Sequence, residues 1–326
     1  MPNLIPDMLW YTVYILDVST VDLAFFNNEF FILPSKTVNY FYGISILNPL
    51  YILLFLAGTL LYAISGKKES RLLDFSFSIL FISGIISVIN LLFEFSIRIF
   101  LASGNIFEDY NFLLLIIYIL KLAVILFISY VYLRKRYKDK KLILLDENFI
   151  KIYKKNNGVE SIPKYQEASK LQRFGHYFID FFMIVFLFSK FIFTMSDVIK
   201  DLVYFIGDRL TMFLLYFIVS TFYYLLFETL FKATPGKYLM YTGIIHAKDN
   251  RISFGQIVIR TLSRRIPFEA FSFLGTTTNG WHDKLSNTVV VEHEADKKYG
   301  KIAKIILSIL ALTFLVFVIL NLIDKF

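Results

Sequence analysis

Six long apolar stretches constrain this chain more than any other feature of its sequence. Each holds about 20 residues with few charges, close to the length that a helix needs to cross ~30 Å of hydrocarbon. The whole chain is 57% hydrophobic and 18% aromatic, well outside the composition of soluble globular domains. We therefore expect an all-α polytopic integral membrane protein with about six transmembrane helices. The predicted spans cover residues 42–64, 73–101, 111–133, 174–194, 210–231 and 302–323.

The distribution of Lys and Arg predicts how these spans are oriented. Basic residues collect after the first predicted span, in "RKRYKDKK" after the third, and throughout residues 232–300. Acidic residues dominate before the first span and between the second and third. Because cytoplasmic loops carry the excess of Lys and Arg, both termini are expected outside and the two large loops in the cytoplasm. We interpret the net charge of +8 as contact with anionic lipid headgroups, since no pattern for nucleic-acid binding is present.

The segment before the first predicted span is expected to lie on the outer surface. Residues 8–32 are long enough to form a seventh span, which is the alternative, but Asp17, Asp22 and Glu29 would be costly in hydrocarbon. The start, "MPNLIPDMLW", lacks a basic region followed by a short apolar core, so no cleavable signal peptide is expected. The sequence contains no Cys, which excludes disulfides and thiolate metal sites.

The cytoplasmic parts are predicted to contain small β-hairpins and an interfacial helix. Strand-like runs lie in residues 142–162 and 237–253, each with a turn signal. Residues 253–271 predict a helix that begins with a capping box of Ser253 and Gln256. Its arginines beside an apolar stripe are typical of a helix lying on the cytoplasmic leaflet, and packing against the protein's own spans is an equally plausible alternative. The arginines expected to contact lipid are Arg260, Arg264 and Arg265.

Ionisable residues open the fourth predicted span. Arg173, His176 and Asp180 are separated by three and four residues, so they share one helical face. Asp180 lies ~10 Å inside the span, and a lipid-facing acid there is costly, so this face is expected to point into the bundle. Glu228 of the fifth span is expected in the same half of the membrane. The set predicts either a proton- or cation-binding site or a structural network in which Arg173 pairs with Asp180.

A second polar cluster occupies the N-terminal spans. Asn90, Glu94 and Arg98 recur at every fourth position of the second span, and Lys121 lies near the middle of the third. Glu94 and Lys121 are expected at similar depths, which predicts an intramembrane salt bridge. The cluster is interpreted either as a contact that holds two helices together or as an outer vestibule above the inner cluster.

Four motifs follow one another in the C-terminal half. They are "ASKLQRFGHYFIDFFMIVF", "YLLFETLFKATPGKYLM", "SFGQIVIRTLSRRI" and "WHDKLSNTVVV". In this order they resemble the domain of the RDD family of bacterial membrane proteins: an Arg-to-Asp helix, a helix ending in an acid and a Thr-x-Gly-Lys turn, a basic helix, and a closing His-Asp segment with a strand. The Arg and the two Asp of the family name correspond to Arg173, Asp180 and Asp283, while Lys284 stands where the family more commonly has Arg.

The resemblance divides the chain into five regions. They are an outer-surface segment (1–41), a three-helix membrane region (42–133), a basic cytoplasmic linker (134–166), an RDD-like domain (167–292) and a C-terminal transmembrane helix (302–323). The resemblance implies a multi-pass protein of the bacterial cytoplasmic (inner) membrane. It also implies transport, since cation/proton exchange is attributed to some members of the family.

Two functions are compatible with these features. The first is a transporter of a small cation or solute, open to proton coupling, that uses the buried Arg/His/Asp face. The second is a non-enzymatic accessory or scaffold subunit of an inner-membrane complex, with protein partners or further copies of itself. No enzyme, cofactor or metal site is expected. The segment Thr234–Lys237 lacks the pattern of a P-loop and is interpreted as a tight turn, and the few His near acids, such as His282, lack the spacing of metal ligands.

Overall fold

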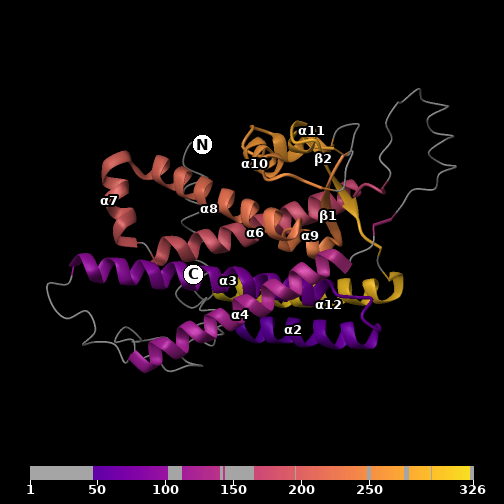
Figure 1. The fold of residues 1–326 in the computed structure, drawn as a ribbon, viewed down its shortest axis with the longest axis horizontal. Helices are drawn as coiled ribbons and strands as arrows, with labels where there is room; N and C mark the ends of the chain where they lie inside the picture. The colour runs from indigo at the N-terminus through magenta and orange to yellow at the C-terminus, as the bar shows by residue number, and fades with distance from the viewer. Residues whose placement is uncertain are drawn as a thin grey trace.

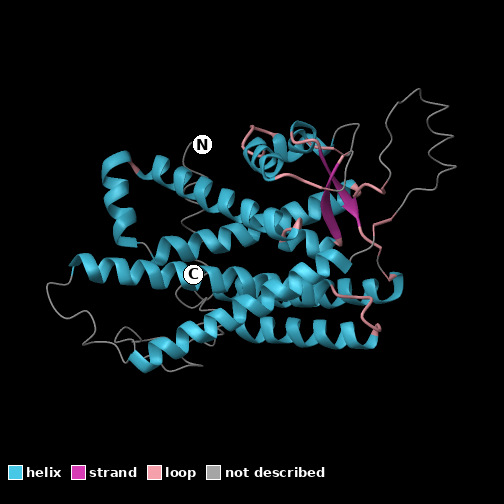
Figure 2. Cartoon of the chain, viewed as in Figure 1, coloured by secondary structure: helices cyan, strands magenta, loops and turns pink. Residues whose placement is uncertain are grey.

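The computed structural model describes residues 47–101, 112–139, 142–143, 165–194, 196–247, 251–274, 279–294 and 296–323. The predicted outer-surface segment, including residues 8–32, lies outside them. The described chain is mostly helical, and its long helices run side by side along the longest axis of the molecule (Figure 1, Figure 2). These are α2 (Leu47–Ile64), α3 (Arg71–Leu101), α4 (Phe112–Asp139), α6 (Lys170–Thr194), α8 (Asp208–Phe231) and α12 (Lys297–Ile323).

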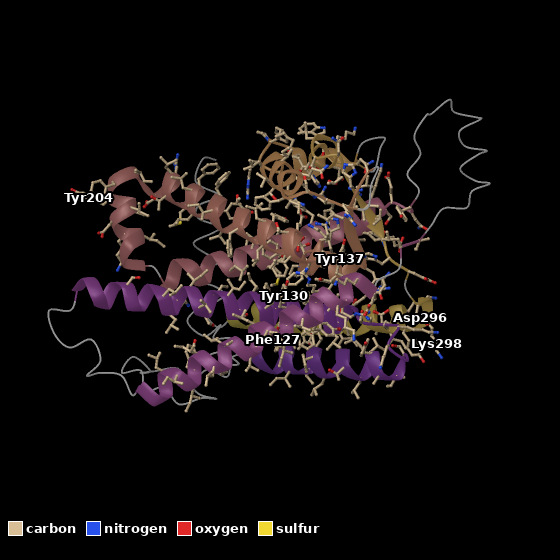
Figure 3. The ribbon with its side chains drawn as sticks, viewed as in Figure 1. Phe127, Tyr130, Tyr137, Tyr204, Asp296 and Lys298 are labelled. Carbon is tan, nitrogen blue, oxygen red and sulfur yellow. The ribbon has the colours of Figure 1, made fainter. Side chains whose placement is uncertain are left out.

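Helices occupy the positions of all six predicted spans. Over the described residues, three of them are long and apolar enough to cross a bilayer: Arg71–Leu92 in α3, Leu115–Asp139 in α4, and α8. Large apolar side chains project from their outer faces, as Phe127 does from α4 (Figure 3). Such faces are stable against lipid and costly in water. The helix α4 also continues to Asp139, so the first residues of the predicted linker are helical.

A helix not predicted from the sequence, α7 (Ser196–Ile206), joins α6 to α8. Gly207 follows it with a φ of 81°, a left-handed conformation that glycine adopts without strain. Tyr204 of α7 is 89% exposed and marks one end of the molecule, whereas Asp296 and Lys298 mark the opposite end (Figure 3). The chain therefore turns back between α6 and α8 through a short helix instead of a loop.

Two short strands form a small sheet at the end of the bundle. The strand β1 (Thr242–His246) pairs antiparallel with β2 (Thr288–Glu292). The hairpin predicted within residues 237–253 is wrong, because β1 pairs with a strand far along the chain and a helix, α10 (Phe254–Ser263), begins soon after the expected turn. Both strands are buried on both faces. A strand buried in this way is expected to have consecutive apolar residues instead of alternating ones, and Val289–Val291 of β2 follow this pattern.

Three short helical elements surround this sheet. They are α9 (Pro235–Met240), the 3-10 helix η1 (Glu269–Leu274) and α11 (Trp281–Leu285). The capping box that was predicted to start α10 is confirmed: Ser253 accepts from the Gln256 amide while Gln256 accepts from the Ser253 amide. Of the strand-like run at 142–162, only residues 142 and 143 are described.

One apolar core joins the N-terminal helices to the C-terminal half. Phe81 of α3 packs edge-on against Phe231 of α8, with ring centroids 5.1 Å apart, and also contacts Phe227. Leu133 of α4 and Tyr238 of α9 belong to the same buried cluster. Large aromatic side chains of this kind dominate the energetics of a packed core. The helices α3 and α4 therefore pack directly against the elements that build the polar site described next.

Candidate functional site

The buried side of α6 carries three ionisable residues. Arg173, His176 and Asp180 are 2%, 9% and 1% exposed, whereas Phe174 and Phe178 on other sides of the helix are about half exposed. This arrangement follows from the cost of placing charge against lipid, which turns the polar face inward. The helix therefore delivers an arginine, a histidine and a carboxylate to the interior of the bundle.

Asp180 accepts hydrogen bonds from three donors on other elements. The Tyr223 hydroxyl of α8 donates to Oδ1 at 2.7 Å, and the Gly236 amide donates to the same oxygen at 2.9 Å. The Thr234 hydroxyl donates to Oδ2 at 2.6 Å. Because the carboxylate is fully buried, these donors replace the water that it would otherwise bind. Asp180 thus connects α6 to α8 and to the start of α9.

The segment Thr234–Lys237 positions these donors. Thr234 caps α9 and accepts from the Lys237 amide at 3.4 Å, which satisfies a free amide of the first turn. A Cβ on Gly236 would lie 2.8 Å from Asp180 Oδ1 and would clash with the His176 carbonyl oxygen. The sequence interpretation of this segment as a tight turn did not foresee its role at the site. The only signal was a Gly–Lys pair soon after the acidic end of a predicted span.

Glu228 is the centre of a second cluster, at the last turn of α8. Lys237 Nζ and Arg264 Nη2 each donate to Oε1 at 2.6 Å, and Arg264 Nη1 donates to Oε2 at 3.2 Å. Arg260 Nε lies 3.4 Å from Oε2. The Arg264 guanidinium also lies 4.0 Å above the centre of the Tyr224 ring. Lys237 thus connects Glu228 to the short segment that holds Asp180.

Asp283, in the first turn of α11, is the third buried carboxylate. Arg173 donates to one of its oxygens and Arg260 to the other, and the Gly280 amide adds a hydrogen bond of 3.2 Å. Arg173 therefore pairs with Asp283, and the alternative in which it pairs with Asp180 is wrong. The reason is geometric: Asp180 faces α8 and the start of α9, whereas Arg173 lies about two turns nearer the sheet and faces α11.

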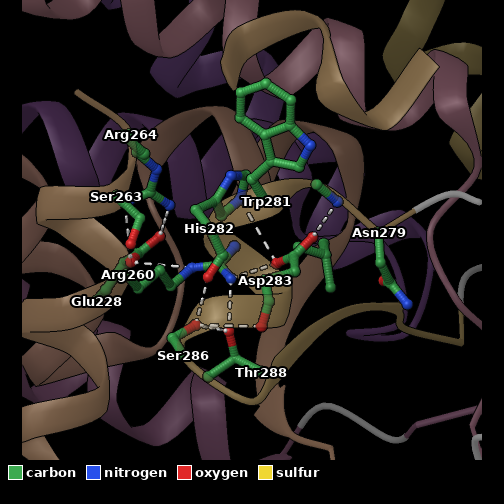
Figure 4. A network of polar contacts seen from close by, with 12 residues as sticks. Glu228, Arg260, Ser263, Arg264, Asn279, Trp281, His282, Asp283, Ser286 and Thr288 are labelled. Atoms are coloured by element: carbon green, nitrogen blue, oxygen red, sulfur yellow. Dashed lines mark hydrogen bonds and ion pairs between the residues drawn. The ribbon is translucent and has the colours of Figure 1, made fainter. Parts of the chain in front are cut away.

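Arg260 joins the last two carboxylates. It is 0% exposed, lies between Glu228 and Asp283 (Figure 4), and donates to the Thr288 hydroxyl at 2.6 Å. The expected lipid contact of Arg260, Arg264 and Arg265 is therefore wrong for these side chains. Arg260 and Arg264 bind buried carboxylates, which would otherwise remain uncompensated in the interior. Arg265 donates instead to hydroxyls and a carbonyl oxygen of α8. Packing against the protein's own spans, the alternative considered from the sequence, describes them.

The network contains equal numbers of cations and carboxylates. Outside the predicted spans, burial lowers the pKa of Lys237 to about 8, although the Glu228 carboxylate opposes this shift. Burial would raise the pKa of Asp283, but Arg260 and its other cationic neighbours hold it well below its ordinary value. The cationic side chains are Arg173, Lys237, Arg260 and Arg264, and the carboxyl groups are those of Asp180, Glu228, Glu269 and Asp283.

Two buried side chains at this site, one of them in the network, keep donor-capable nitrogens without a hydrogen-bond partner in the described part of the chain. They are Nε2 of His176, and Nε and Nη2 of Arg260. Buried polar atoms of this kind are rare in folded proteins and call for an additional acceptor or donor. The network can therefore take up a further small polar group, such as a water molecule, without breaking the bonds already made.

The predicted N-terminal cluster is only partly covered by the structure. The side chains of Glu94 and Arg98 lie outside the described residues, and those of Asn90 and Lys121 are half-buried on α3 and α4. The Glu94–Lys121 salt bridge stays a prediction.

Asp74, at the other end of α3, was expected at the cytoplasmic surface with no special role, but this expectation is wrong because the side chain is fully buried. Tyr132 and Ser70 donate to its two oxygens at 2.9 Å, and Arg136 Nε lies 3.5 Å from Oδ1. Arg136 also donates to the Ser70 hydroxyl at 2.6 Å. This cluster ties α3 to α4, and the signal that could have found it is an acid in the first turn of one span facing a basic run at the end of the next.

Comparison with protein families identifies the C-terminal half of the chain. Residues 168–325 match the model of the RDD family, so the match begins at the first of the four motifs and continues through α12. Comparisons with curated proteins and with solved structures gave no match. Of the three residues that correspond to the family name, Arg173 and Asp283 form an ion pair while Asp180 is held separately by neutral donors. Residues 168–325 of this membrane protein therefore form a domain of the RDD family.

Proposed function

We propose that this protein moves a small cation or solute across the bacterial cytoplasmic membrane in exchange for protons. Six spans with both termini outside would place the ionic network in the cytoplasmic half of the membrane. The observation that carries the proposal is the position of Lys237. Its ammonium binds Glu228, and the residue before it in the chain, Gly236, donates to Asp180. The role is not enzymatic, since it requires binding and release only.

The chemistry of the network favours exchange at this point. Arginine cannot release its proton in a protein, so the three guanidiniums keep their charge. Lys237 can release its proton, since its pKa lies near 8. Its loss would leave one negative charge uncompensated between Asp180 and Glu228, and carboxylate oxygens are suitable ligands for small hard cations. One proton and one monovalent cation would then alternate at the same place.

Access would require a conformational change. The three carboxylates are fully buried in this conformation, and transporters expose such sites to one side of the membrane at a time. The segment Thr234–Lys237 is the part that could open, because it holds Asp180 through two hydrogen bonds and Glu228 through one.

Proteoliposomes containing the purified protein test this proposal. Collapse of an imposed pH gradient is followed as Na⁺, Li⁺ or K⁺ is added. Asp180→Asn should abolish cation-dependent proton movement, and Asp201→Asn, the same change on an exposed carboxylate of α7, should leave it intact. Each variant is first checked for a single symmetric peak in gel filtration. Equal flux in wild type and folded Asp180→Asn would refute the role of this site.

A non-enzymatic accessory or scaffold role is the second candidate. It is favoured by the saturation of the network, since each oxygen of Asp180, Glu228 and Asp283 has a donor or cation within 3.4 Å, as expected of a structural ion-pair network. Absence of flux in every sample, together with a protein that co-purifies in mild detergent, would support this role.

A further inference from the structure

The segment that follows the sheet has its polar and apolar faces reversed relative to a soluble protein. On α10 and the turn after it, Ile259, Leu262 and Ile266 are exposed, whereas Arg260 and Arg264 are buried or nearly so. A helix on the surface of a soluble domain shows the opposite pattern, with its charges in water. The outer face of this segment is therefore suited to an apolar surrounding.

The tip of the segment reaches the middle of a span. Arg265 donates to the Ser220 hydroxyl at 2.6 Å, to the Thr221 hydroxyl at 3.1 Å and to the Phe217 carbonyl oxygen at 3.5 Å. At 1.5 Å per residue, Ser220 lies ~16 Å from Phe231 and ~18 Å from the other end of α8. Whichever way α8 crosses the membrane, Arg265 contacts it near the midplane.

The segment then returns toward the sheet. It approaches along α8 as Arg264 binds Glu228 and Arg265 binds deeper positions, and η1 then contacts α6. The chain comes back through α11 to β2, so α10 lies beside α8 between its middle and the sheet, and α11 packs against α10 and β2 (Figure 1). In Figure 4 the Trp281 indole points away from the ionic network.

The backbone at the tip has few unsatisfied groups. The Arg265 and Ile266 amides donate to carbonyl oxygens three residues earlier, Pro267 has no amide, and the Glu269 amide donates to the Ile266 carbonyl oxygen. A turn can lie at membrane depth only when its amides are satisfied in this way. Phe268, which is 79% exposed, closes the tip with an apolar side chain.

The neighbouring surface indicates what covers this face. Phe213, Ile218 and Phe222 of α8 and Phe178 of α6 expose large apolar side chains on the spans beside the segment. The apolar face of the segment continues this surface, and the same solvent should cover both. We propose that residues 254–274 and 279–285 form a re-entrant segment embedded in the membrane, with its arginines turned to the network and its apolar face against the acyl chains of one leaflet.

Spin labels on the full-length protein in proteoliposomes test this proposal. Because the chain has no Cys, Leu262→Cys and Phe268→Cys each give a single labelling site on an exposed side chain. Collision of the nitroxide with oxygen reports contact with acyl chains, and collision with a water-soluble nickel chelate reports contact with water. Ile218→Cys on α8 is the lipid control, and Glu294→Cys, exposed near the sheet, is the water control.

Lipid contact should give both labels an oxygen-to-nickel accessibility ratio close to that of Ile218→Cys and several-fold above that of Glu294→Cys. A ratio like that of Glu294→Cys would place the segment in water and overturn the proposal. Low collision with both reagents would also overturn it, because protein, from a second copy or a partner, would then cover the face. Neither result depends on whether the protein transports, so this proposal and the proposed function fail independently.

Discussion

The Lys237 ammonium is buried against Glu228, and its environment predicts a defined pH dependence of stability. Burial lowers its pKa from the ordinary 10.5 to about 8 in the folded protein, so between pH 8 and 10.5 the unfolded chain binds more protons than the folded one. Stability therefore rises as pH rises through this window, by on the order of 3 kcal/mol. Lys237→Gln should lack this rise when unfolding free energies are measured in detergent across the window. Parallel curves for wild type and variant would contradict the expectation.

Gly236 allows α9 to approach α6, so an added methyl group should be costly there. The Cβ in Gly236→Ala would crowd Asp180 Oδ1 at 2.8 Å as well as the His176 carbonyl oxygen. We expect overpacking to lower the free energy of unfolding by roughly 1–3 kcal/mol. Gly255→Ala is the matched control, because nothing lies within 4 Å of the added carbon in α10. Unfolding in detergent measures both variants, and equal stabilities would show that α9 moves aside freely.

Sequence periodicity predicted which side chains of α6 face inward, but not what they bind. Arg173 and Asp180 share a face in any helix, and the cost of charge in lipid fixes which way that face points. Their partners, Asp283 and Thr234, come from distant parts of the chain whose approach depends on tertiary packing. No periodic pattern encodes that approach, so the ion pair between Arg173 and Asp283 could not be deduced from spacing.

At the scale of elements, the Arg173–Asp283 pair ties α6 to α11, and a double-mutant cycle can measure this tie. Removing one partner of a buried pair leaves the other uncompensated. Arg173→Met and Asp283→Asn should therefore each lower the free energy of unfolding by ~3–5 kcal/mol. The double variant should lose less stability than the two single variants together, and the difference should be ~0.5–3 kcal/mol. Arg173→Met combined with Asp201→Asn, on exposed α7, should be additive. Additivity in the first cycle would mean that the two side chains do not interact in solution.

The orientation of α10 shows why amphipathic patterns are ambiguous in membrane proteins. The sequence correctly placed Ile257 and Arg260 in one capped helix, yet both side chains are buried, and the exposed face consists of residues such as Leu262. In water the charged face is the outer one, but beside lipid a charged face turns inward when it finds acceptors there. The acceptors, Glu228 and Asp283, were visible in the sequence, but their distance from α10 was not.

At the scale of the whole molecule, two of the N-terminal helices, α3 and α4, share one core with the RDD domain. Phe81 of α3 packs among the aromatic rings of α8, and Tyr241, at the start of the sheet, donates to the Lys68 carbonyl oxygen beyond α2 at 3.2 Å. Six helical segments could be predicted because each needs only its own apolar length. Their neighbours could not, since apolar faces in a membrane are alike and packing selects among them by shape.

This shared core predicts that the two halves recognise each other without a covalent connection. Residues 1–150 and 151–326, expressed together as separate chains, should co-purify in mild detergent through a tag on one of them. Phe81→Ala should weaken this association, because truncating a buried aromatic ring costs ~3–5 kcal/mol. Phe127→Ala is the matched control, since that ring is 68% exposed on α4 and its loss removes no protein contact of similar size. Recovery of the tagged half alone, or equal recovery with both variants, would mean that the connecting chain, and not the core around Phe81, holds the halves together.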